Sequence, residues 1–215
     1  MDHILAQHKL TLLRDQRLSS AVYRQLMTEI GYILCNYVTS DIELIKGEYE
    51  FDAASGLKGP YVDQKSIVIV PILRAGLGLA NAFQSLIPNC MSGHIGLVRD
   101  HEKNRVNIYM HSIPVGENLH YIILDPVVHS TQSIQAACRI IEERFLHEGM
   151  RLSFEKIRVA SVICHEQGVA NFFKMDHFKG VKIFTVGADT EEDKENPNFL
   201  YPGIGDAGDR IFGLS

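Results

Sequence analysis

The stretch LDPVVHSTQS, from Leu124 to Ser133, has the residue types of a loop that binds an anion. Asp125 and Pro126 follow an apolar run, and hydroxyl side chains precede an amphipathic pattern that predicts a helix. The first amides of a helix have no acceptor within the helix and carry partial positive charge, so they attract phosphate. The alternative is that Ser130 or Ser133 is an ordinary helix N-cap.

Two arginines follow other apolar runs. Arg74 lies in PILRAGLG, Pro71 to Gly78, where Gly76 lets the backbone approach a ligand closely. The guanidinium is a planar fork of donors that suits phosphate or pyrophosphate. A tight turn with a solvated arginine is the alternative. Arg99 comes directly after the apolar run Ile95 to Val98.

The stretch PGIGDAGD, Pro202 to Asp209, holds three glycines and two aspartates. Closely spaced N–H and C=O groups in such a loop can bind the hydrogen-bonding edge of a planar base. Asp206 or Asp209 can bind a metal ion or a hydroxyl group. A plain acidic turn is the alternative.

Histidine and cysteine show no metal-binding motif in this sequence. The neighbours Cys164, His165 and Glu166 would point in different directions at a strand end, so we expect no metal site there. The cysteines are scattered among apolar residues, which predicts buried free thiols in a reducing compartment. They are Cys35, Cys90, Cys138 and Cys164.

The elements that must position these residues are strands and helices in alternation. Continuous apolar, β-branched runs predict strands of a parallel sheet covered on both faces. These runs are Ile67–Ile72, Ile95–Val98, Tyr121–Leu124, Ile157–Ile163 and Val181–Val186. Helical periodicity separates several of them, at Gly78–Leu86, Ser133–His147 and Glu166–Met175. We therefore predict an α/β fold, and ligands bind at the carboxyl ends of the strands in such sheets.

Three further elements are expected. Ser20 to Tyr37 predicts an amphipathic helix capped by Ser19 or Ser20, and Ile42 to Phe51 predicts an outer strand. Polar residues from Asp100 to Asn107, with alternation continuing to Met110, predict an antiparallel arm at about residues 98–112. Such an arm is either a lid over the site or an ordinary surface hairpin.

Length and composition predict one soluble domain over residues 1–215, with N-terminal helices and the arm as parts of it. The chain has 215 residues, 46% of them hydrophobic, which is enough for a full core. A net charge of −5 argues against nucleic-acid binding. No apolar run is long enough to span a bilayer, and the N-terminus lacks the pattern of a signal peptide. We expect no membrane contact and a cytoplasmic location.

Three motifs together resemble the uracil phosphoribosyltransferase family, one of the type I phosphoribosyltransferases. They are HKLTLLRDQR at His8–Arg17, PILRAGL at Pro71–Leu77 and PGIGDAGDRIFG at Pro202–Gly213. The resemblance covers nearly the whole chain. It implies a twisted, mostly parallel sheet flanked by helices, with a projecting antiparallel arm.

The reaction that the resemblance implies belongs to pyrimidine salvage. Uracil takes the phosphoribosyl group of phosphoribosyl pyrophosphate (PRPP), giving UMP and pyrophosphate. The resemblance also implies Mg²⁺ as the cofactor, GTP binding, and a homodimer or larger homo-oligomer.

The resemblance also implies roles for individual residues. Arg74 and Arg99 would hold pyrophosphate, and Asp125 would contact the ribose hydroxyls of PRPP. Asp125, Asp206 and Arg99 would be catalytic, and Asp206 would serve PRPP and its metal ion. The arm would carry a tyrosine, Tyr109. The remaining PRPP contacts would be Pro126, Val127, Val128, His129, Ser130, Thr131, Gln132 and Ser133. Uracil would contact Leu200, Gly205, Asp206 and Ala207.

Several positions depart from the family pattern. The family loop reads roughly D-P-x-x-A-T-G-G-S, whereas this chain has His129 for the alanine and Thr131 and Gln132 for the glycines. A non-glycine residue in left-handed geometry costs about 1–2 kcal/mol, which would weaken phosphate binding. The alternatives are that the loop takes another shape, that only one of the two glycines needs positive φ, or that the donors of Thr131 and Gln132 compensate. The arm, with Lys103 and Arg105, is more basic than expected, and the run from Phe199 to Tyr201 is bulkier.

Three functions fit these observations. The first is an active uracil phosphoribosyltransferase with a retuned phosphate loop. The second is a catalytically silent relative that binds a nucleotide or uracil as a regulator, because the glycine pair is missing. The third keeps the enzyme and changes the base.

Overall fold

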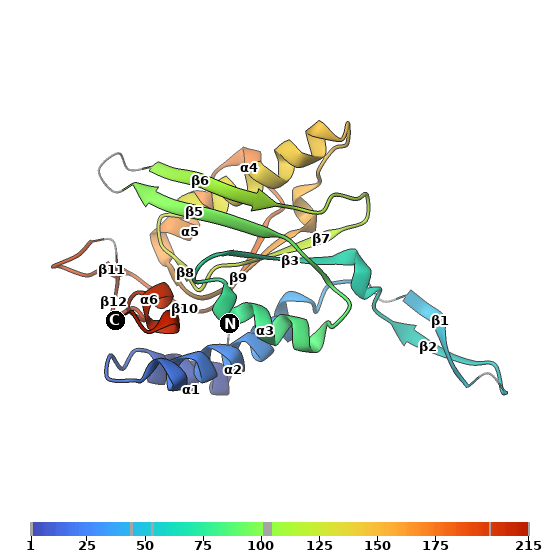
Figure 1. Cartoon of the computed structure of the whole chain (residues 1–215), viewed down its shortest axis with the longest axis horizontal. Coiled ribbons are helices and arrows are strands. Elements are labelled where there is room, and N and C mark those ends of the chain that lie inside the picture. Colours follow the sequence, from blue (N-terminus) through green and yellow to red (C-terminus); the bar gives the residue numbers. More distant parts are fainter. Residues whose placement is uncertain (1, 44, 53, 101–104, 198, 215) are drawn as a thin grey trace.

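The computed structural model describes residues 2–43, 45–52, 54–100, 105–197 and 199–214 (Figure 1). Within these ranges it describes residues 45–48, 99 and 100 by their backbone only.

An eight-stranded sheet forms the centre of the fold, in the order β10-β9-β7-β3-β5-β6, with two short strands alongside. The long strands are β3 (Ile67–Leu73), β5 (His94–Asp100), β6 (Arg105–Ser112), β7 (His120–Leu124), β9 (Ile157–His165) and β10 (Lys182–Asp189). Short β4 (Met91–Ser92) pairs with β3, and β8 (Val127–Val128) pairs with β9. All pairings are parallel except that of β5 with β6. The α/β fold and the five predicted strands are confirmed.

Helices cover both faces of this sheet, as Figure 1 shows. On one face lie α1 (Ile4–Leu13), α2 (Ser20–Val38) and α3 (Leu77–Leu86); on the other lie α4 (Gln132–His147) and α5 (Glu166–Phe173). The residues of β3 alternate between these faces, because successive side chains of a strand point to opposite sides. Ile67 and Ile69 join the core under α2, and Val68 and Val70 join the core under α4.

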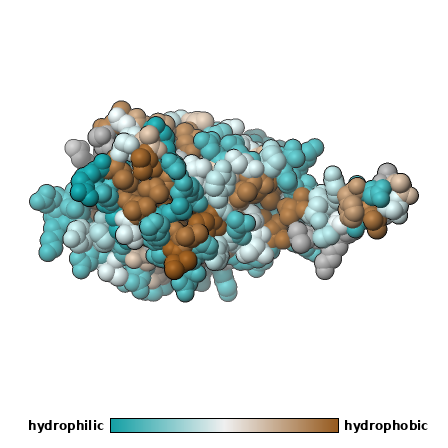
Figure 2. All heavy atoms as spheres, turned by 90° about the horizontal axis from the view of Figure 1, so that it is seen from below, coloured by the Kyte–Doolittle hydropathy of each residue, from teal (hydrophilic) through white to brown (hydrophobic). Residues whose placement is uncertain are grey.

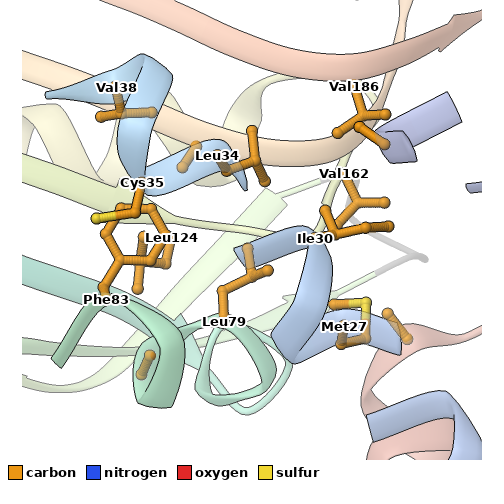
Figure 3. Close-up of a cluster of buried hydrophobic side chains, with 14 of the residues drawn as sticks. Met27, Ile30, Leu34, Cys35, Val38, Leu79, Phe83, Leu124, Val162 and Val186 are labelled. Carbon is orange, nitrogen blue, oxygen red and sulfur yellow. The ribbon is translucent and has the colours of Figure 1, made fainter. Parts of the chain in front are cut away.

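Helix α2 begins where the sequence predicts. The Ser19 side chain accepts a hydrogen bond from the Val22 amide at 3.4 Å, which caps the helix. Met27, Ile30 and Leu34 of α2 pack toward Leu79 and Phe83 of α3 and toward Leu124, Val162 and Val186 of the sheet (Figure 3). A Cβ on Gly31 would lie 2.7 Å from the Cβ of Ala82, so glycine there lets α2 and α3 approach closely.

The prediction of an outer strand from Ile42 to Phe51 is wrong in its placement. β1 (Ile45–Asp52) pairs with β2 (Leu57–Tyr61) in a separate antiparallel hairpin that projects from the body of the molecule (Figure 1). Loose alternation of apolar side chains predicts a strand, but it does not say which strand it pairs with.

The predicted arm is the hairpin of β5 and β6, and it continues the main sheet as its edge. Arg99 pairs with Val106 and Asp100 with Arg105 in the backbone register. Lys103 lies outside the described residues.

Short elements complete the chain. Three 3₁₀ helices span Gln64–Ser66, Phe154–Lys156 and Asp176–Phe178. Near the C-terminus, β11 (Glu191–Glu192) pairs with β12 (Leu200–Tyr201), and α6 (Ala207–Phe212) follows.

Apolar side chains also reach the surface, in separate patches on the face seen in Figure 2. Among the described residues, no helix is long and apolar enough to cross a membrane. The four cysteines are free, and all but Cys90 are buried, as their apolar neighbours predict.

Candidate active site

A pocket of about 830 Å³ lies at the carboxyl ends of the central strands, where the motifs Pro71–Leu77 and Pro202–Gly213 meet the loop Asp125–Ser133. Its wall consists of Ile72, Leu73, Arg74, Ala75, Leu97, Val98, Tyr109, Asp125, Val127, His129, Ser133, Asn196, Phe199, Gly205, Asp206, Ala207 and Gly208. The parallel sheet brings these segments together because its loops all leave from one edge.

The pocket contains some of the predicted site residues but not others. Those in its wall are Arg74, Asp125, Val127, His129, Ser133, Gly205, Asp206 and Ala207, and Tyr109 joins them from β6. Described residues that lie behind the wall are Pro126, Val128, Ser130, Thr131, Gln132 and Leu200. The side chain of Arg99 lies outside what the structure describes.

Eight residues of the wall were not among the predicted site residues. They are Ile72, Leu73, Ala75, Leu97, Val98, Gly208, Asn196 and Phe199. The bulky run at Phe199 was a signal for the last of these, but apolar strand residues look alike in sequence whether they face core or pocket.

Arg74 lies in the turn between β3 and α3. Its guanidinium Nη2 donates a 2.9 Å hydrogen bond to Asp209 Oδ1, and both side chains are partly exposed. A Cβ on Gly76 would lie 2.4 Å from the carbonyl oxygen of Leu124, so the turn needs glycine to pass the end of β7. This close crossing places the Arg74 turn beside the loop that follows β7.

The predicted phosphate-binding loop, Asp125–Ser133, is hydrogen-bonded to β9 before it reaches helix α4. The Asp125 amide donates to the carbonyl oxygen of Ala160 at 3.1 Å. The Pro126 carbonyl accepts from the amides of Val162 and Ile163 at 3.0 and 3.1 Å. Asp125 is therefore held at the end of the sheet, with its half-buried side chain in the pocket wall.

The loop before α6 is held by residues near the N-terminus. Arg14 donates two hydrogen bonds to the Asp189 carboxylate, at 2.9 and 2.8 Å, and a third to the Gly203 carbonyl at 2.9 Å. Asp189 in turn accepts from the Gly203 amide at 2.8 Å. Gly203 and Gly205 have φ of +55° and +69°, values that favour glycine.

Arg210 joins the same loop to residues at and just after the end of α1. It is 5% exposed, its guanidinium donates to the carbonyl oxygens of Leu13, Ile204 and Asp15 at 2.6–2.8 Å, and it stacks 4.2 Å from the Tyr23 ring centre. The conspicuous HKLTLLRDQR motif thus supports the C-terminal loop, a role that spacing alone did not reveal.

Comparison with known proteins decides the family. The family model for uracil phosphoribosyltransferase matches residues 1–214 of the chain. This chain belongs to the uracil phosphoribosyltransferase family.

Individual relatives agree with this assignment over full length. Uracil phosphoribosyltransferase of Rhodospirillum centenum is 33% identical over 214 residues, which are 99% of this chain and 94% of the relative. The Rhizobium meliloti enzyme of the same name is 35% identical over 213 residues, 98% and 95% of the two chains. Among solved structures, the AQ2163 protein of Aquifex aeolicus superimposes with a TM-score of 0.87 at 27% identity, covering 100% of this chain and 97% of the other.

The two positions that lost the family's glycines differ in backbone geometry. Thr131 has φ +62°, whereas Gln132 is the first residue of α4. Of the two positions, Thr131 has the left-handed geometry and Gln132 does not, which matches the alternative that only one of the two glycines needs positive φ. Thr131 is also the N-cap, so the alternative of a Ser130 or Ser133 cap is wrong.

Thr131 stays in this conformation with side-chain support. Its hydroxyl donates to the Ser130 carbonyl at 2.6 Å and accepts from Gln135 Nε2 at 3.1 Å. The Gln135 amide also donates to the Thr131 carbonyl at 2.9 Å. Neither Thr131 nor Gln132 enters the pocket, so the loss of the glycines leaves the cavity open.

His129, which replaces the family's alanine, lies in the pocket wall. Its Nε2 is 3.0 Å from Glu192 Oε1, and its ring centre is 5.3 Å from that of His165. These contacts hold the imidazole at the side of the cavity, so the pocket is not blocked by it.

Proposed function

We propose that this protein transfers the phosphoribosyl group of PRPP to uracil, releasing pyrophosphate and forming UMP. In this step the bond from the anomeric carbon to the pyrophosphate oxygen breaks, and pyrophosphate leaves with the electron pair. A bond from that carbon to a uracil nitrogen forms, and the nitrogen loses its proton. The observation that carries the proposal is the single pocket in which Arg74, Asp125, the start of α4 and the loop at Gly205 meet.

The start of α4 supplies the binding site for the 5′-phosphate. Ser133, in the first turn of α4, lines the pocket and is buried, and helix N-termini attract anions. Asp125, on the adjacent loop, is positioned to accept hydrogen bonds from the ribose hydroxyls. Val127 lies between them in the wall and excludes water from one side of the sugar.

Arg74 completes the site for the leaving group, and the loop at Gly205 completes the site for the base. The Arg74 guanidinium has donors for pyrophosphate if it exchanges its partly exposed contact with Asp209. The backbone groups at Gly205 and Ala207 face the same pocket and suit the planar edge of uracil. Because the transition state resembles an oxocarbenium ion, rate acceleration comes mainly from holding the reactants in place and from stabilising charge.

The proposal includes Mg²⁺ bound together with pyrophosphate. Hard cations prefer oxygen ligands, and Mg²⁺ is usually held by one or two carboxylates plus substrate phosphates. Asp206 and Asp125 supply carboxylates in the pocket wall, which fits this pattern. No cluster of three or more potential metal ligands occurs among the described residues, which is consistent with an ion that PRPP brings to the site.

No specific observation favours the alternatives of a silent regulator or of a different base. The hypothesis of a silent relative rested on the missing glycine pair, and of the two replaced positions Thr131 has positive φ whereas Gln132 is helical. Homo-oligomer formation, GTP binding and a cytoplasmic location stay predictions. The projecting β1–β2 hairpin supports the first of these, because Tyr49, Phe51 and Leu57 are 52–61% exposed on it.

The test is a pyrophosphate-release assay with PRPP, Mg²⁺ and a panel of nucleobases. We expect turnover with uracil that exceeds turnover with cytosine, adenine, guanine and hypoxanthine. The matched control is a variant with Arg74→Ala, which should lose most turnover because pyrophosphate loses its donor. No turnover with uracil across a wide range of PRPP would refute the proposal, and preference for another base would redirect it.

A further inference from the structure

One side-chain contact joins two segments beside the pocket, the loop before α4 and the hairpin of β11 and β12. In the proposed function these segments bind the phosphate and the base of the nucleotide. His129 lies in the loop between β8 and α4, and Glu192 lies in β11. Their side chains meet at 3.0 Å, between His129 Nε2 and Glu192 Oε1. The histidine side chain is 12% exposed and the glutamate side chain 46% exposed, so the contact is shielded from water on one side.

Each partner is itself held by its own segment. The His129 ring packs against His165, the N-cap of α5, and a Cβ on Gly168 would lie 2.1 Å from the His129 carbonyl oxygen. The phosphate loop is thus pressed against the start of α5. Glu192 pairs with Leu200 between β11 and β12. Leu200 lies two residues before Pro202, where the loop that leads to Gly205 and α6 begins.

Hydrogen bonds join described residues of the hairpin that carries Glu192, and two residues of this hairpin line the same pocket. The Asp193 amide donates to the Phe199 carbonyl at 2.9 Å, and the Asp193 carboxylate accepts from the amides of Glu195 and Asn196. Asn196 and Phe199 both lie in the pocket wall. Glu192 therefore belongs to the same hairpin as two residues of the pocket wall.

We propose that His129 and Glu192 form a positioning pair. The pair joins the proposed phosphate-binding loop, Asp125–Ser133, to the hairpin of β11 and β12 next to the proposed uracil site. The pair sets the spacing between the site of the 5′-phosphate and the site of the base, so it acts on ligands that occupy both. This inference rests on the proposed function, because that function makes UMP such a ligand. The pair is specific to chains with these two residues, since the family pattern has alanine at position 129.

The experiment is a double-mutant cycle on UMP affinity, measured by titration calorimetry. We expect His129→Ala and Glu192→Gln each to weaken UMP binding about three- to tenfold, the range for a close polar contact that water partly screens. The double variant should bind like either single variant, because the same contact is lost in all three. His129→Gln, whose polar side chain can approach Glu192 in the same way, should bind UMP within about twofold of the parent.

The matched control is the contact between His177 and Glu142, which has the same 3.0 Å length and lies away from the pocket wall. His177→Ala and Glu142→Gln should leave UMP affinity within about twofold. Melting temperatures of all variants show whether a loss of affinity reflects unfolding.

The outcomes separate the two proposals. UMP binding that is unchanged in both single variants, or losses that multiply in the double variant, overturns the positioning pair alone. A failure of His129→Gln to restore affinity also overturns it. If the parent protein binds no UMP and turns over no uracil, the proposed function fails first and the pair fails with it.

Discussion

At the scale of single residues, one side chain both holds the backbone and lines the pocket. Asp206 is the N-cap of α6, where its carboxylate accepts a hydrogen bond from the Asp209 amide at 2.8 Å. The same side chain lies in the pocket wall and is exposed. Its structural and chemical roles can be separated because asparagine caps a helix as well as aspartate does.

Asp206→Asn should lower kcat for UMP formation about a hundredfold or more, because in the proposed reaction this carboxylate supplies a negative charge next to PRPP and Mg²⁺. The free energy of unfolding should change by less than about 0.5 kcal/mol, since the cap is kept. Steady-state kinetics and urea unfolding measure the two quantities.

Asp63→Asn is the matched control for this change. Asp63 is also an N-cap, accepts from the Lys65 amide at 3.1 Å, and lies away from the pocket wall. It should leave both quantities unchanged. An Asp206→Asn variant with full activity would remove this carboxylate from the mechanism.

At the scale of elements, the junction between the phosphate loop and α4 decides what the missing glycines cost. Thr131 is 2% exposed and is the one described non-glycine residue with positive φ. Gln132 has helical geometry, where glycine is the poorer residue. The two departures from the family pattern therefore have opposite effects on stability.

Thr131→Gly should raise the free energy of unfolding by about 1 kcal/mol, because relief of left-handed strain outweighs the lost hydroxyl contacts. Gln132→Gly should lower it by about 1 kcal/mol, because glycine disfavours the helix. Urea unfolding of the two single variants gives both signs. Equal stabilisation by the two changes would contradict the geometry of this junction.

At the scale of the whole molecule, a charged cluster at the amino ends of β7, β9 and β10 joins strands at the end opposite the pocket. Arg158 is 3% exposed and donates to Asp41 Oδ1 at 3.0 and 2.8 Å, and Lys182 also donates to Asp41. Arg158 Nη1 lies 3.1 Å from His120 Nδ1. That nitrogen must be the acceptor, so the contact needs a neutral imidazole.

This cluster predicts a loss of stability in mild acid. Burial, with help from Arg158 and Lys156, lowers the pKa of His120 below its ordinary value of 6.5. The unfolded chain therefore binds a proton more readily than the native protein does. The contribution of His120 is fully present above pH 6.5 and is lost as pH falls toward the lower native pKa.

His120→Gln should flatten the fall of the melting temperature between pH 7 and pH 5.5, because a glutamine does not titrate. His147→Gln is the control, since His147 lies on the surface with a side chain 76% exposed. Melting curves of both variants and the parent over this pH range provide the measurement. The same slope in His120→Gln as in the parent would show that other groups cause the acid dependence.

The sequence by itself determined the α/β class, the five central strands, the helices between them and the residues with chemical potential. Continuous apolar runs and helical periodicity are local patterns, so they can be read without knowing what lies beside them. Motif identity over nearly the whole chain likewise indicated the family, and the match over residues 1–214 confirmed it.

Only the tertiary structure decided which of those residues share a pocket and how they are held. Arg14 holds the Gly203 carbonyl, 189 residues away along the chain, and Arg210 joins the loop beside it to the Leu13 carbonyl, 197 residues away. The contact of His129 with Glu192 joins residues far apart in sequence, and the φ angle of Thr131 and the separation of the β1–β2 hairpin from the main sheet also became known only from the folded backbone. Backbone geometry and side-chain partners of this kind arise from packing, and the order of residues alone does not state which segments pack together.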